Sequence, residues 1–190
     1  MADRPKPTAI LLFVAKRGYT RDTIRGGASD WDVSRPFTSY ARLLSTLLAH
    51  PVRFFELLPK VPDVRAPGLF LAFCGLPAAV AWFVFAGLYP ALLALVLPLP
   101  LSVALAGLYH AGALGGRYGF GVTWRVLAYP LGFVLPLAAV PVLRWVALAW
   151  AGALLVPLGI VKAQEVPPWR GLALGAVCAA VLVVAASVLP

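Results

Sequence analysis

Apolar and polar residues follow two different patterns along this chain, and the change falls near residue 65. Between residues 36 and 49 the apolar residues recur at helical spacing on one face, which predicts an amphipathic helix. Pro36 suits the first turn of that helix, and Pro51 interrupts it before a second short helix that carries Phe54, Phe55 and Leu58. The apolar face of the first helix consists of Phe37, Tyr40, Ala41, Leu44, Leu47 and Leu48.

Four cations accompany these two amphipathic helices. A helix with one apolar face and basic residues beside it is typical of a segment that lies flat on a membrane. We therefore expect Arg35, Arg42, Arg53 and Lys60 to contact the membrane surface. The alternative is that the apolar faces pack against the protein's own spans, and both arrangements can hold together.

The second pattern is an almost unbroken apolar sequence from residue 68 to residue 190, in which Glu165 is the only acid. A helix needs about 20 apolar residues to cross about 30 Å of hydrocarbon. The sequence predicts five spans, at 68–89, 91–110, 122–140, 143–162 and 170–189. The expected fold class is all-α: a polytopic bundle of five transmembrane helices (63–190), preceded by a basic tail (1–35) and amphipathic interfacial helices (36–62).

Composition supports a membrane protein. The 190 residues are 62% hydrophobic and only 12% charged, with a mean hydropathy of +0.89, whereas a soluble domain is about 25% charged. The net charge is +9, and 11 of the 16 Lys and Arg residues lie in residues 1–65. Because spans are attached to this basic segment, we predict a bilayer with anionic lipids as its partner, and no nucleic acid.

The positions of the cations also predict the orientation. With the basic tail in the cytoplasm, Arg117 and Arg125 fall at the link between the second and third spans, on the cytoplasmic side. Lys162 and Arg170 fall at the link between the fourth and fifth spans, on the same side, and only Arg144 lies outside. The N-terminus is then cytoplasmic and the C-terminus external. The preference for Arg over Lys, 12 to 4, suggests a GC-rich prokaryote, and hence its inner membrane.

Prolines and small residues predict bent, closely packed helices. Pairs of glycines four residues apart, 112/116, 115/119 and 171/175, favour close approach of helices. Prolines within or near the spans remove backbone donors and kink helices; they are Pro77, Pro98, Pro100, Pro130, Pro136 and Pro157.

The side chains offer little for catalysis. Cys74 and Cys178 lie inside apolar runs and are interpreted as small hydrophobic residues, while His50 and His110 have no partner at metal-ligand spacing. We predict no metal, no cofactor and no enzymatic activity. Ion-coupled transport usually needs carboxylates within the membrane, and no Asp or Glu lies between Val64 and Gln164.

Three residues form the candidate cluster near the cytoplasmic end: His110, Arg125 and Tyr129. A simpler interpretation of His110 is a helix-end residue at the interface. Tyr129 lies deeper, so its hydroxyl needs a partner between helices. Trp124, together with Tyr118, Trp145 and Trp169, falls close to a predicted boundary, as residues of an aromatic belt do.

Several stretches of the chain form a recognisable series: 48–58 (LAHPVRFFELL), 67–70 (PGLF), 108–110 (LYH), 115–116 (GG) and 120–130 (FGVTWRVLAYP). Over about residues 43–188 this series resembles Yip-domain proteins, a family of integral membrane proteins that interact with small GTPases. The resemblance implies five spans and a cytoplasmic N-terminal region. Eukaryotic relatives bind small GTPases and act in vesicle budding, which is not expected in a prokaryote.

These observations predict a non-enzymatic integral membrane scaffold or adaptor that organises protein partners or lipid at the cytoplasmic face. We expect a membrane-protein partner or a homo-oligomer. The alternative is a permease or channel subunit, or an accessory subunit of a larger membrane complex.

Overall fold

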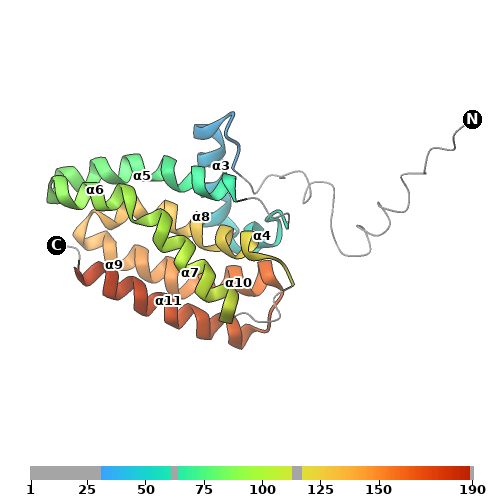
Figure 1. The fold of residues 1–190 in the computed structure, drawn as a ribbon. Coiled ribbons are helices and arrows are strands. Elements are labelled where there is room, and N and C mark those ends of the chain that lie inside the picture. The colour runs from blue at the N-terminus through green and yellow to red at the C-terminus, as the bar shows by residue number, and fades with distance from the viewer. Residues whose placement is uncertain (1–30, 61–63, 113–116, 189–190) are drawn as a thin grey trace, which may run out of the picture.

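The computed structural model describes residues 31–60, 64–112 and 117–188, and these residues form helices joined by short links (Figure 1). The first helices are α3 (Pro36–Ala49) and α4 (Pro51–Glu56), at the positions that the amphipathic pattern predicts. Most of the predicted tail, residues 1–30, lies outside the described residues, as do the glycines 115 and 116.

The helices that follow run side by side along one axis (Figure 1). They are α5 (Arg65–Ala86), the bent pair α6 (Leu88–Val96) and α7 (Pro98–Gly112), α8 (Phe120–Ala138), the continuous series α9 (Pro141–Ala149), η1 (Trp150–Leu155) and α10 (Val156–Gln164), and α11 (Pro168–Val188). η1 is a stretch of π-helix.

Three of these helices are long and apolar enough to cross a membrane by themselves: Arg65–Ala86, Phe120–Ala138 and Pro141–Gln164. The pair α6 and α7 makes a fourth if the two helices, bent by 43°, form one span. Within α11, Pro168–Val181 is a shorter apolar helix. The part of the chain with assigned structure is therefore all-helical, with three to four helices able to span, and the prediction of a membrane fold is confirmed at that level.

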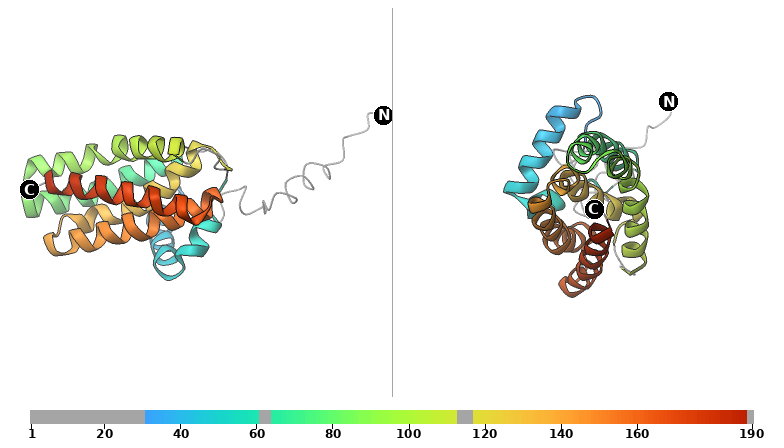
Figure 2. Two further views of the ribbon diagram at one scale, coloured as in Figure 1. Left: turned by 90° about the horizontal axis from the view of Figure 1, so that it is seen from below. Right: turned by 90° about the vertical axis from the view of Figure 1, so that its left-hand side faces the viewer.

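The centre of the bundle is occupied by α8. Residues 121–130 are all buried, and α8 packs against α5, α7, α9 and α10. Seen along the bundle axis, the other helices of the bundle surround it (Figure 2). Hydrophobic burial on every side suits a helix that is apolar all round.

The prolines act unequally. Pro98 begins α7 at the 43° bend after α6, because proline cannot donate the backbone hydrogen bond that would continue the preceding turn. Pro77 and Pro130 lie inside α5 and α8, which continue through them. Gly171 and Gly175 both pack against Pro157, where a Cβ atom at Gly175 would lie 2.1 Å from Pro157 Cγ. Close approach at this glycine pair is therefore confirmed.

Helix α3 lies across the bundle rather than along it (Figures 1 and 2). Its inward face is centred on Leu43 and Leu47, which are fully buried, and the Tyr40 ring lies 5.1 Å from that of Phe133 on α8. Phe37, Ala41 and Leu48, which the sequence placed on the apolar face, are exposed. α4 packs against α10. The two amphipathic helices thus pack against the protein's own bundle, which was the alternative to lying free on a membrane.

One aromatic prediction was wrong. Trp124 does not belong to a lipid-facing belt, because it is buried between α7 and α8, and its indole N–H donates to Ser102 Oγ at 2.9 Å. Trp145 and Trp169 are exposed, as belt residues are.

Candidate functional site

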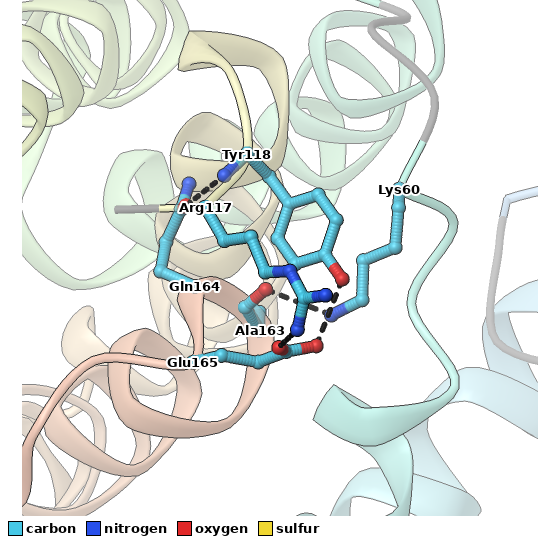
Figure 3. Close-up of polar contacts among 6 residues, drawn as sticks. All are labelled: Lys60, Arg117, Tyr118, Ala163, Gln164 and Glu165. Atoms are coloured by element: carbon cyan, nitrogen blue, oxygen red, sulfur yellow. Dashed lines mark hydrogen bonds and ion pairs between the residues drawn. The ribbon is translucent and has the colours of Figure 1, made fainter. Parts of the chain in front are cut away.

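Polar side chains gather at the end of the bundle where α8 begins and α10 ends (Figure 3). We call this group the polar end cluster; it consists of Lys60, Arg117, Tyr118, Gln164 and Glu165. Its members come from three separate parts of the chain: the segment after α4, the residues before α8, and the link between α10 and α11. The cluster therefore joins elements that are distant in sequence.

Glu165 terminates α10 in the left-handed conformation, with φ of 54°. Its carboxylate pairs with the Arg117 guanidinium, and the Tyr118 hydroxyl donates to Oε1 at 2.8 Å. Burial raises the pKa of Glu165, but the bonds from Tyr118 and Arg117 outweigh it, so that the pKa lies below its usual 4.5. The side chain is ionised at neutral pH and holds the residues before α8.

Gln164 completes the start of α8. The N-cap residue Gly119 has no side chain to satisfy the free amides of the first turn. The fully buried Gln164 does not bond to those amides; it accepts from the backbone N–H of Tyr118, just before the N-cap, at 3.0 Å and donates to the Thr123 side chain at 2.8 Å. The end of one long helix thereby fixes the beginning of another.

Lys60 is partly buried and points toward the end of α10 and the Tyr118 ring (Figure 3). Its ammonium donates to the Ala163 carbonyl at 2.8 Å and lies 4.8 Å from the centre of the Tyr118 ring. Burial lowers the pKa of Lys60 to about 8, against the opposing charges of Glu165 and Glu56. Lys60 thus differs from the three arginines predicted to share its role.

Those three arginines lie on α3 and α4 or just before them. Arg35, Arg42 and Arg53 are all exposed. Arg35 and Arg42 line one cavity of about 300 Å³ together with Asp32, Thr38 and Ser39. Arg53 lies apart from that cavity, on α4.

The three residues of the predicted cluster, His110, Arg125 and Tyr129, contact three different parts of the protein. His110 Nδ1 lies 3.4 Å from Thr123 Oγ1, and its ring meets Phe120 edge to face. Arg125 is 1% exposed and donates to the Pro59 carbonyl at 3.0 Å. The Tyr129 hydroxyl accepts from the backbone N–H of Trp31 at 3.4 Å, while its ring packs against Phe54 and Phe70.

These contacts therefore connect α8 to three different neighbours. His110 reaches α8 from α7, Arg125 on α8 reaches the segment after α4, and Tyr129 on α8 reaches the residues before α3. Their positions are those of residues that hold elements together. Thr123 contacts both His110 and Gln164, and so links this trio to the polar end cluster.

Sequence reasoning missed Tyr118, Gln164 and Glu165 as site residues. A signal for Glu165 was present, because it is the one acid after residue 63 and the charge pattern puts its link on the same side as Arg117. Gln164 gave no such signal, since its role depends on the approach of α10 to the start of α8.

The polar side chains of this site join neighbouring elements. Within residues 31–60, 64–112 and 117–188, no group of three His, Cys, Asp or Glu side chains could hold a metal ion. In the polar end cluster Glu165 pairs with Arg117, and the hydrogen bonds run to backbone atoms and side chains of neighbouring elements.

The fold and the site define an all-helical protein with several helices able to span a membrane and a polar assembly at one end of its bundle. No family model, curated protein or solved structure matches the chain. The resemblance to Yip-domain proteins stays a prediction.

Proposed function

We propose that this protein is a non-enzymatic integral membrane scaffold that organises protein partners at the cytoplasmic face of a prokaryotic inner membrane. In this proposal α5, the α6–α7 pair, α8, the α9–α10 series and α11 form five spans. The N-terminus is cytoplasmic and the C-terminus external, because this orientation keeps every cation except Arg144 on the cytoplasmic side.

The observation that carries the proposal is the filled centre of the bundle. A permease or channel needs a polar or hydrated path between its helices. Here the central position is taken by α8, whose residues 121–130 are all buried. Many exposed large apolar side chains instead lie on the outer surfaces of α5, α6 and α9, for example Val80, Val96 and Val146, as lipid contact requires.

The proposed contact region is the pair α3 and α4. α3 is anchored to the bundle through Leu43 and Leu47, and α4 through Phe54, all of which are fully buried; Lys60, just after α4, bonds to the Ala163 carbonyl. Their outer faces carry exposed apolar residues, Leu48 and Val52, beside Arg53. A rigidly held, mixed apolar and basic surface at the end of a membrane anchor suits protein docking.

Site-specific photo-crosslinking tests this proposal. A photoreactive residue is placed at Leu48 or Val52 in the full chain in native membranes, with Val80 on the lipid-facing side of α5 as the matched control. We expect discrete protein adducts from Leu48 and Val52, identified by mass spectrometry, and lipid adducts from Val80. In parallel, liposomes that contain the purified protein alone should show no solute flux.

Two outcomes would overturn the scaffold. Flux through the purified protein would favour the permease or channel. Protein adducts from Val80 without any from Leu48 or Val52 would favour an accessory subunit that docks through its spans.

A further inference from the structure

The cavity beside α3 differs from the rest of the molecule in how its cations are held. Arg35, the N-cap residue of α3, and Arg42, seven residues later on that helix, both line the cavity of about 300 Å³, and both are exposed. Neither has a hydrogen-bond or ion-pair partner among the described residues. The geometry points to a binding site for the phosphate group of an anionic phospholipid at this cavity, which we call the α3 cavity.

The charges in the α3 cavity favour an anion. Two guanidinium groups face one carboxylate, that of Asp32. Asp32 Oδ1 accepts from the Ser34 backbone N–H at 2.9 Å and from the Ser34 hydroxyl at 2.7 Å. These bonds commit Asp32 to its own turn, so the cavity keeps an excess of one positive charge. An arginine matches phosphate oxygens with two parallel N–H donors.

The two hydroxyl groups of the α3 cavity, those of Thr38 and Ser39, bond to the backbone, so they fix the shape of the cavity more than they bind an anion. Thr38 Oγ1 donates to the Arg35 carbonyl at 3.3 Å, and the buried Ser39 hydroxyl accepts from the Asp32 backbone N–H at 3.2 Å. Both bonds join the turn before α3 to the first turns of the helix. They hold the two arginines on one wall, and the arginines supply the donors for an anion.

The surroundings favour a lipid over free phosphate. Phe37, next to the cavity wall, is 77% exposed, and its ring meets that of Phe73 on α5 at 5.3 Å. Phe73 is the ninth residue of α5 and lies, at 1.5 Å per residue, about 12 Å along that helix. Leu69 and Leu76 on either side of it are exposed. The α3 cavity therefore opens beside the apolar flank of a spanning helix, where a headgroup with acyl chains can reach both.

This inference deepens the proposed function and rests on its membrane-spanning part, but not on any protein partner. Binding is measured on the purified full chain in neutral detergent by native mass spectrometry, during titration with dioctanoyl phosphatidylglycerol. We expect one saturable site for this lipid, with weaker binding of dioctanoyl phosphatidylcholine.

The decisive comparison uses two double variants that remove the same charge. R35Q/R42Q removes the arginines of the α3 cavity, and R53Q/R170Q removes two arginines outside it. Since each basic residue near an anionic lipid contributes about fivefold in affinity, R35Q/R42Q should weaken binding about twentyfold, and R53Q/R170Q by no more than about twofold. Equal losses in the two would mean diffuse attraction and would overturn the site.

An isosteric variant tests the same site from the opposite direction. D32N keeps the oxygen that accepts from Ser34 but removes the negative charge that faces the arginines, so it should tighten lipid binding severalfold. Unchanged or weaker binding in a folded D32N chain would contradict the charge argument, even if R35Q/R42Q failed to fold.

Inorganic phosphate separates the two sources of the anion. In large excess it should displace little phosphatidylglycerol, because it lacks the acyl chains that contact Phe37 and α5. Full displacement by inorganic phosphate would identify a site for a free anion instead. Adducts at Leu48 and Val52 do not depend on this lipid, so the scaffold and the lipid site can fail separately.

Discussion

The cations at the end of the bundle and those on α3 are held differently. Lys60, Arg117 and Arg125 each donate to an acceptor on another element: the Ala163 carbonyl, the Glu165 carboxylate and the Pro59 carbonyl. Arg35 and Arg42 are exposed and line a shared cavity at the start of α3. The first group stabilises the fold through these bonds, whereas the second remains available to bind a ligand. Equal charge in a sequence can thus have unequal roles.

Replacing a buried arginine should separate the two regions most strongly. R125Q shortens a side chain that is 1% exposed and leaves the Pro59 carbonyl without its 3.0 Å donor. We expect a loss of about 3 kcal/mol in the free energy of unfolding. R42Q, at an exposed position, should change it by less than about 0.5 kcal/mol. Thermal unfolding in detergent, followed by intrinsic fluorescence, measures both, and equal effects would contradict the comparison.

The second largest loss in the free energy of unfolding should come from a methyl group added at Gly159. A Cβ atom there would lie 2.6 Å from Val126 Cγ1 and 2.7 Å from Phe55 Cε1, at the junction of α10, α8 and α4. G159A should therefore cost about 1–3 kcal/mol, because overpacking forces neighbours to shift.

Gly107 is the matched control for that prediction. It lies in α7 with nothing within 4 Å of an added Cβ atom, so G107A should be neutral or stabilise by up to about 1 kcal/mol. The same unfolding assay applies, and a G159A chain as stable as G107A would show that α4 does not pack tightly on the bundle.

Variants at Glu165 should change the stability of the protein less, and the order of their unfolding temperatures tests whether the backbone at this residue is strained. E165Q removes the exposed ion pair with Arg117 and should cost no more than about 1 kcal/mol. E165G and E165A both remove this pair and the acceptor for the Tyr118 hydroxyl, but only glycine suits the left-handed φ of 54°, which is worth about 1 kcal/mol. We expect E165G to unfold at a higher temperature than E165A. The reverse order would show that the Glu165 backbone is not strained.

The pH dependence of Lys60 is the most local prediction. Burial lowers its pKa to about 8 in the folded protein, against 10.5 for an unperturbed lysine. Between these values the unfolded chain binds more protons, so this group makes the folded protein more stable as pH rises through that window.

Lysine labelling at different pH values checks this. Reductive methylation of Lys60, read by mass spectrometry, should reach half its maximum near pH 8. E165Q should shift that midpoint downward, because the Glu165 charge raises the pKa of Lys60. A midpoint near 10.5 would mean that Lys60 is solvated like an ordinary surface lysine.

Much of the fold could be predicted from the sequence because lipid and helical geometry restrict it strongly. The predicted helix at 36–49 coincides with α3, and the ranges 122–140 and 143–162 lie within about two residues of α8 and of the α9–α10 series. The span predicted at 91–110 is instead a bent pair, α6 and α7, which breaks at Pro98. Pro77 and Pro130 show that a proline alone does not determine a break.

The site was harder to predict, since it is built by contacts between distant segments. The sequence pointed to Arg125 and Tyr129 as candidate residues. It did not predict that Arg125 donates to the Pro59 carbonyl or that the Tyr129 hydroxyl accepts from the backbone N–H of Trp31. Lys60 and Arg42 were indistinguishable as basic residues beside an apolar face. Only the packing of α4 against α10 turns Lys60 inward.

The orientation of the bundle is the claim on which the lipid site and the scaffold both depend. In a chain with Cys74 and Cys178 replaced by alanine, single cysteines at Ser45, Val142, Trp169 and Ser187 are treated with a membrane-impermeant maleimide. The account predicts labelling of Ser45 and Trp169 only in inside-out vesicles, and of Val142 and Ser187 only in right-side-out vesicles. Labelling of Ser45 and Val142 from the same side would contradict it.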